Sequence, residues 1–142
     1  MAIVAPRLCE TMATRVWPRW RKETLATLID GEPVFIEQKN GHRFLALYLA
    51  AKAPRGAAII AHGRGWGPDF ELYGVLRTRL AEAGYSTLSI QLPVLESTSK
   101  LGDYLPTFVD SDERFALAAR WLALNLILFA SGRKNRLAAP IP

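Results

Sequence analysis

A short apolar run that leads directly into a glycine-rich turn places the strongest constraint on how this chain folds. Residues 57–61 are alanine and isoleucine only, and His62-Gly63-Arg64-Gly65 follows at once. An apolar run without alternation is typical of a strand buried on both faces. Glycines directly after it allow unusual backbone angles or the close approach of another group. The pattern predicts a buried strand whose carboxyl end opens into a tight turn.

Alternating strand-like and helix-like segments surround this run and predict an α/β domain. Asn40-Gly41 lies between two strand-like segments and predicts a type I′ hairpin turn. A hairpin followed by strands and helices in alternation predicts a three-layer domain with a mostly parallel sheet and an antiparallel N-terminal hairpin. The predicted strands are residues 33–38, 44–51, 57–61, 86–91 and, with continuation of a helix as the alternative, 125–130.

Two helices are expected in the second half of the chain. Asp69 predicts the N-cap of the first, and Gly84 predicts its left-handed end. The spacing of apolar residues gives this helix one buried face. That face is expected to hold Leu72, Tyr73, Leu76, Leu80 and Ala83. The second helix is expected from Asp110, which forms a capping-box pattern with Glu113, and residues 94–109 before it are expected to be a loop.

Composition limits the classes of protein. The chain has 142 residues, one cysteine and two histidines, which excludes a disulfide framework and multi-cysteine or His-cluster metal sites. We expect no metal and no cofactor. The net charge of +5 lies entirely in the two ends, because residues 31–130 hold equal numbers of acidic and basic side chains. A nucleic-acid surface normally lies on the folded body, so we expect no nucleic-acid partner.

The charge distribution divides the chain into three parts. These are a basic peripheral segment at residues 1–30, a domain at residues 31–130 and a basic tail at residues 131–142. The best apolar run, residues 121–130, is shorter than the ~18 residues of a spanning helix, and the start of the chain has no apolar signal-peptide core. We therefore expect a cytoplasmic protein without a transmembrane segment. Cys9 lies in the peripheral segment and has no expected catalytic role.

The glycine-rich turn is the expected binding site, because ligands of open α/β sheets bind beyond the carboxyl ends of strands. Two uses of its amide groups compete, a phosphate cradle and an oxyanion hole. The dinucleotide pattern G-x-G-x-x-G requires a third glycine at position 68, where Pro68 stands, and no Walker motif is present. The residues therefore favour the oxyanion hole, with a plain glycine turn as the alternative.

These residues also resemble a known superfamily. The residues that carry the resemblance are Asp30-Gly31-Glu32-Pro33, residues 41–48, residues 58–65 with Trp66, Pro68 and Asp69, Leu76-Arg77, Leu80, residues 84–93, Tyr104 and Pro106. They are similar to the N-terminal half of an α/β hydrolase, and within that superfamily to an uncharacterised bacterial family known only as a domain of unknown function. The resemblance covers about three-fifths of the chain. It implies that Gly63, Arg64 and Gly65 form the oxyanion-binding turn, and that His62 is structural.

The superfamily's nucleophile stands in G-x-S-x-G, and its triad continues with an acid and a histidine. Ser131 is the candidate nucleophile by position, but Phe129 and Arg133 occupy the glycine positions. No Asp, Glu or His follows Ser131. The S-x-x-K spacing of Ser131 and Lys134 offers a serine–lysine alternative. We therefore expect an ester- or acyl-hydrolase-like protein that is truncated or catalytically incomplete.

Two other functions remain open from the sequence. One is a non-catalytic module that binds a small molecule or a partner through the glycine-rich turn or through an exposed sheet edge. Loss of later strands would expose that edge and favour a homodimer. The other is a peripheral membrane protein that uses the basic ends, with Trp17 and Trp20 as interfacial anchors.

Overall fold

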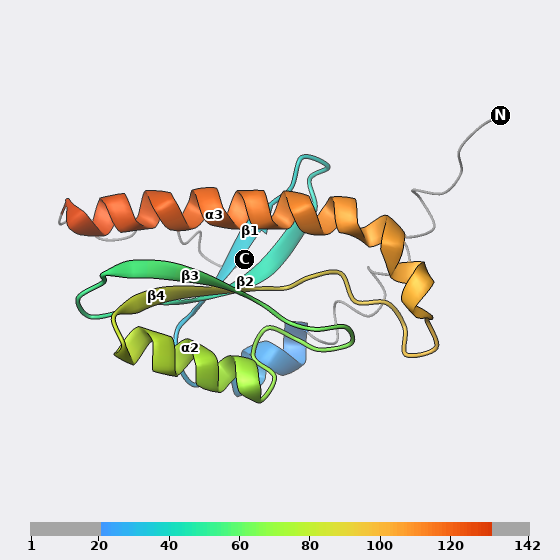
Figure 1. Cartoon of the computed structure of the whole chain (residues 1–142), viewed down its shortest axis with the longest axis horizontal. Coiled ribbons are helices and arrows are strands. Elements are labelled where there is room, and N and C mark those ends of the chain that lie inside the picture. Colours follow the sequence, from blue (N-terminus) through green and yellow to red (C-terminus); the bar gives the residue numbers. More distant parts are fainter. Residues whose placement is uncertain (1–20, 132–142) are drawn as a thin grey trace.

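A four-stranded sheet lies between helices on its two faces (Figure 1). The computed structural model describes residues 21–131. The expectations for Cys9, Trp17, Trp20, Lys134 and most of the basic ends lie outside these residues. The strands are β1 (Glu32–Glu37), β2 (Arg43–Leu49), β3 (Gly56–Ala61) and β4 (Tyr85–Ile90). The helices are α2 (Leu72–Glu82), the 3-10 helix η1 (Leu101–Thr107) and α3 (Phe108–Ala130), and residues 21–27 are also helical.

The predicted α/β class and four of the predicted strands are confirmed, but the expected mostly parallel sheet is wrong. The strand order is β1-β2-β4-β3. β2 pairs antiparallel with both β1 and β4, and only β3 and β4 pair in parallel. The chain crosses from β2 to the far edge of the sheet, so β4 inserts between β2 and β3. The hairpin is therefore part of the body of the sheet, and most pairings are antiparallel.

β3 differs from its predicted environment because it is an edge strand. Its apolar sequence predicts burial on both faces, yet only Ile60 of this strand is fully buried. Both α2 and α3 contact β3, so its two faces are partly covered while one lateral edge has no strand beside it in the described part of the chain. The carboxyl ends of the parallel pair β3 and β4 lie together at one end of the sheet.

The expected strand at residues 125–130 is wrong, and its helical alternative is correct. α3 runs without a break from Phe108 to Ala130. No glycine or proline interrupts the segment, so nothing stops helix propagation. The expected loop at 94–109 is also partly wrong, because η1 occupies Leu101–Thr107 and leads directly into α3.

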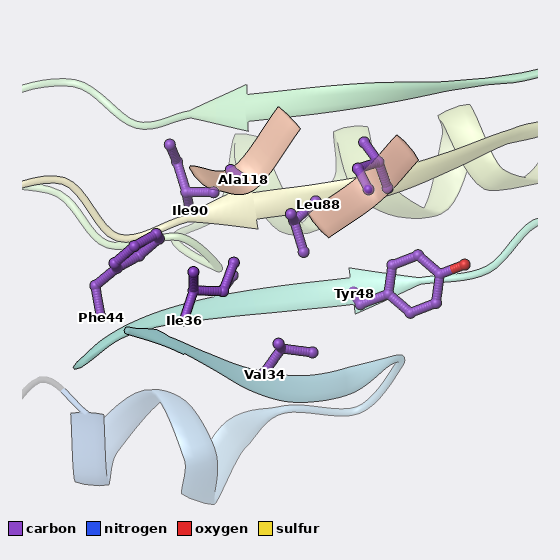
Figure 2. Packing of buried hydrophobic residues seen from close by; sticks show 9 residues of the cluster. Val34, Ile36, Phe44, Tyr48, Leu88, Ile90 and Ala118 are labelled. Carbon is purple, nitrogen blue, oxygen red and sulfur yellow. The ribbon is translucent and has the colours of Figure 1, made fainter. Parts of the chain in front are cut away.

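The main hydrophobic core lies between α3 and the sheet. Figure 2 shows its members converging from β1, β2, β4 and α3. The buried cluster consists of Val34, Ile36, Phe44, Ala46, Tyr48, Leu88, Ile90, Ala118 and Leu122. Tyr48 also meets Trp121 edge-on, with ring centroids 5.1 Å apart. Alternate residues of each strand share one face, so the period-two pattern delivers these side chains to α3.

The opposite face of the sheet buries both apolar residues of β2 and polar residues of β4, and α2 on that side contributes a buried arginine. Arg77 is buried, whereas Leu72 and Leu76 of the predicted apolar face are exposed. Arg77 forms an ion pair with Asp69 and donates a hydrogen bond to the carbonyl of Asp30. The predicted N-cap role of Asp69 is therefore wrong: Glu71 is the N-cap residue, and the Asp69 carboxylate binds Arg77 instead. Gly84 does end the helix as predicted, with φ of +91°.

The hairpin is confirmed, but its turn type is not. A type I′ turn requires positive φ at both central residues, and Asn40 does not have it. Instead, the Gly41 amide donates to the carbonyl of Gln38, the Gln38 amide donates to the carbonyl of His42, and Gly41 has φ of +82°. This is a three-residue loop in which a glycine in the left-handed region closes the turn.

We expect Gly31→Ala to be strongly destabilising. Gly31 has φ of +96°, and a Cβ on it would lie 2.5 Å from the carbonyl oxygen of Tyr48. The left-handed conformation alone costs about 1–2 kcal/mol for a residue with a Cβ, and the clash adds to it. Gly41→Ala is the matched control, since Gly41 has a similar φ but nothing within 4 Å of its added Cβ. Urea unfolding followed by circular dichroism measures both losses, and equal losses would contradict the clash.

Candidate functional site

The turn after β3 is built from a glycine in the left-handed region and a tyrosine hydroxyl. The Trp66 amide donates to the carbonyl of Gly63 over 3.2 Å, and Gly65 has φ of +79°. The Gly63 amide donates to the hydroxyl of Tyr73 in α2 over 2.8 Å. α2 therefore fixes the start of the turn, and the positive φ at position 65 requires glycine for an unstrained backbone.

Two main-chain donors remain available at this turn. Arg64 and Gly65 are both exposed, and within residues 21–131 their amides have no hydrogen-bond acceptor. The Gly63 amide differs, because it is already bound to Tyr73. Of the three residues predicted for an oxyanion-binding turn, Arg64 and Gly65 therefore present free N–H groups, and Gly63 positions them.

Aromatic side chains flank the turn. Trp66 and Phe70 meet edge-on with centroids 4.1 Å apart, and both are partly exposed. The Arg64 guanidinium lies 5.8 Å from the ring centroid of Tyr104, which η1 supplies. The hydroxyl of Tyr104 accepts a hydrogen bond from the amide of Leu95. The loop after β3, the start of α2 and η1 thus meet at the carboxyl ends of β3 and β4.

His62 is buried and both of its ring nitrogens are engaged. Its Nδ1 lies 2.9 Å from the carbonyl oxygen of Gly63, and its Nε2 accepts from the Leu92 amide over 2.9 Å. The side-chain amide of Gln91 lies 3.0 Å from the same Nε2. These contacts select the neutral tautomer with the proton on Nδ1. His62 links the end of β3 to the segment after β4.

Burial lowers the pKa of His62 below its ordinary value of 6.5. The hydrogen bond to the Gly63 carbonyl raises this pKa, and the positive charge of Arg114 lowers it further. Protonation would also place an N–H on Nε2 against two existing donors, from Leu92 and Gln91. His62 is therefore neutral at neutral pH.

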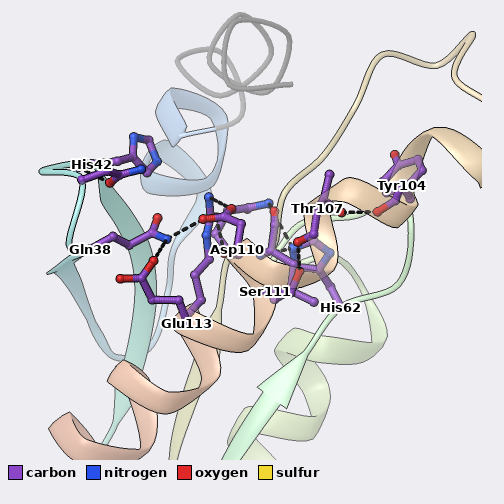
Figure 3. Close-up of polar contacts among 12 residues, drawn as sticks. Gln38, His42, His62, Tyr104, Thr107, Asp110, Ser111 and Glu113 are labelled. Atoms are coloured by element: carbon purple, nitrogen blue, oxygen red, sulfur yellow. Dashed lines mark hydrogen bonds and ion pairs between the residues drawn. The ribbon is translucent and has the colours of Figure 1, made fainter. Parts of the chain in front are cut away.

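A buried polar network extends from His62 to the β1–β2 hairpin (Figure 3). Arg114 of α3 donates to the carbonyl of Gln91 over 2.7 Å and forms an ion pair with Asp110 at 2.8 Å. Asp110 also accepts from the side-chain amide of Gln38, which contacts Glu113 as well. Burial lowers the pKa of Arg114, and the adjacent Asp110 carboxylate opposes that shift.

This network was not foreseen from the sequence, and it corrects one prediction. Asp110 and Glu113 do not form a capping box, because α3 begins earlier, at Phe108, and both carboxylates bind the hairpin instead. The four-residue spacing of Asp110 and Arg114, which places opposite charges on one side of a helix, was the available signal.

Ser131 lies far from the turn. It directly follows the end of α3, where its amide and hydroxyl donate to the carbonyls of Ile127 and Leu128. Arg114, which contacts the segment beside His62, is 17 residues earlier on the same helix. At 1.5 Å rise per residue the two positions are roughly 25 Å apart. The structure does not bring the candidate nucleophile to the turn.

The comparison with known families covers the elements that build this site. The family described as "Protein of unknown function (DUF3530)" matches residues 19–111, about two thirds of the chain. The chain belongs to the DUF3530 family. The matched range includes the whole sheet, the turn after β3, α2 and η1, and it ends at the start of α3. A comparison with curated proteins finds no match.

Neither a metal-binding cluster nor a membrane-spanning helix is found in the described part of this DUF3530 protein. Among residues 21–131, no three His, Cys, Asp or Glu side chains gather in a way that holds a metal ion. No helix in that range is long and apolar enough to cross a membrane. The turn at residues 62–67 is the candidate site because of the two unpartnered amides of Arg64 and Gly65.

We expect the stability of the domain to fall between pH 6.5 and 5 because of His62. Because the pKa of His62 is lower in the folded state, the unfolded state binds more protons at this histidine as the pH falls below 6.5. Unfolding therefore becomes easier as the pH falls, by at most about 1.4 kcal/mol per pH unit. Above pH 6.5 the contribution is fully present. Urea unfolding across this range measures the slope of the unfolding free energy against pH. This slope should decrease in His62→Gln and persist in His42→Gln.

A direct measurement remains decisive if His62→Gln does not fold. NMR titration of the two imidazole rings in the unaltered protein reports each pKa separately. A His62 ring that titrates at 6.5 or above would contradict the assignment.

Proposed function

We propose that this chain is an α/β-hydrolase-like protein that binds a carbonyl-bearing small molecule of the ester or acyl class at the turn after β3. The two unpartnered main-chain donors of Arg64 and Gly65 are the observation that carries the proposal. In α/β hydrolases, an amide of the loop between the third strand and the following helix supplies part of the oxyanion hole. Here the same position in the chain holds an exposed glycine turn between β3 and α2.

The surroundings of the turn support an organic ligand. Trp66 and Phe70 offer partly exposed aromatic surface beside the donors. An ester or acyl group has a carbonyl oxygen to accept the hydrogen bonds and an apolar portion to cover these rings. A phosphate group has no apolar portion to pack against the two rings.

The described residues support binding without turnover. A hydrolase of this type requires a serine, a histidine and an acid in hydrogen-bond reach of one another. Both ring nitrogens of His62 are already engaged with neighbouring groups, so His62 is not available as a general base. Ser131 stands at the far end of α3. The proposal is therefore a hydrolase-like binding domain that is catalytically incomplete in its described part.

NMR titration with ethyl butyrate tests the proposal. We expect saturable shifts of the Arg64 and Gly65 amide signals, and no release of nitrophenol from p-nitrophenyl acetate above the buffer rate. Gly65→Ala should weaken binding about tenfold, because a Cβ at positive φ costs about 1–2 kcal/mol and displaces the turn. Gly41→Ala is the matched control: it has the same kind of strain at a remote hairpin and should leave binding unchanged.

Two outcomes would contradict the proposal in different ways. Absence of any shift at Arg64 and Gly65 would overturn ligand binding at the turn. Ester hydrolysis that disappears in Ser131→Ala would overturn catalytic incompleteness, because it would identify Ser131 as a working nucleophile.

A further inference from the structure

The face of α3 that points away from the sheet carries exposed apolar residues. Figure 1 shows α3 lying along the whole sheet, with one side turned outward. The buried stripe of α3 consists of Arg114, Ala118, Leu122 and Asn125. On the opposite side, Val109 is 78% exposed and Ile127 is 64% exposed. Exposed apolar residues gathered on one element mark an interaction surface.

The outward residues form a single seam with a regular spacing. Its members are Val109, Asp112, Ala116, Arg120, Ala123 and Ile127, all exposed. Successive members are three or four residues apart, so they lie in one line along the helix. This set is called the α3 seam. It contains two opposite charges, and within residues 21–131 neither Asp112 nor Arg120 has an ion-pair partner.

Five of the six α3 seam residues match one another when the helix is reversed about Ala116, and Ile127 lies beyond the matched length. Asp112 and Arg120 lie four residues on either side of Ala116. In an antiparallel pair of α3 helices with a two-fold axis at Ala116, each Asp112 faces the other copy's Arg120, and each Val109 faces the other copy's Ala123. A two-fold interface requires this reciprocal matching, in which residue i meets j and j meets i. The small side chain at the axis lets the two helices approach closely.

We propose that two copies of this chain associate through the α3 seam in an antiparallel two-fold dimer. The charge pattern favours a second copy as the occupant, because a reversed copy of the same helix brings a cation to Asp112 and an anion to Arg120. The open edge of β3 is a different surface, and it carries no comparable pattern. A helix contact of this length is small for a protein interface, so we expect a dissociation constant of roughly 1–100 µM.

Charge reversal on the seam provides a sharp test by sedimentation velocity. Asp112→Arg alone or Arg120→Asp alone places like charges together twice per dimer, and we expect each to weaken dimerisation at least about tenfold. The double variant with both substitutions restores opposite charges across the axis and should recover the dimer. Arg79→Asp, an exposed charge reversal on α2, is the matched control and should leave the dissociation constant unchanged.

Circular dichroism of each variant establishes that the fold is retained. Recovery of the dimer in the double variant supports the seam, since a purely structural defect would not be repaired by a second reversal. A chain that stays monomeric at several hundred micromolar would overturn the proposal. A dimer unaffected by either single reversal would also overturn it and would locate the contact elsewhere, for example at the β3 edge.

Discussion

The buried guanidinium of Arg114 holds together the parts of the structure on which the candidate site depends. It joins α3 to the end of β4 through the Gln91 carbonyl and to Asp110, which in turn binds the hairpin residue Gln38. Its guanidinium carbon lies 5.3 Å from the ring centroid of Phe44 in the core. A charge buried this deeply requires such partners, because leaving it uncompensated would cost several kcal/mol. The turn after β3 is tied to this network through His62 and Gln91.

The order of elements along the chain could be read from the sequence, but their neighbours in space could not. The strand-like segments around Asn40-Gly41 predict the hairpin, and the strand predicted at residues 86–91 agrees with β4 within one residue. Nothing local reveals that β4 inserts between β2 and β3, because strand order depends on the path of the crossover. The prediction of a mostly parallel sheet is wrong because the sequence does not show that β4 pairs with β2.

Side-chain chemistry explains the errors in the helices. Leucine spacing suggested that α2 buries Leu72 and Leu76, but the ion pair of Arg77 with Asp69 fixes a different rotation of the helix. A buried arginine is rare enough that periodicity arguments place it outside. For the same reason, the periodicity of α3 does not predict the polar network around the buried Arg114. For the site, the glycine pattern located the turn correctly, while the role of Tyr73 in holding Gly63 depends on a contact ten residues apart that only the fold creates.

The edge position of β3 affects how fast its backbone amides exchange with solvent. In a parallel edge strand, alternate amides bond to the neighbouring strand and the others point away from it. β3 has no charge, proline or bulge to guard that open side. Amide hydrogen exchange along β3 therefore alternates between slow positions, bonded to β4, and fast positions that face away from β4. The fast amides are the donors with which another strand could pair.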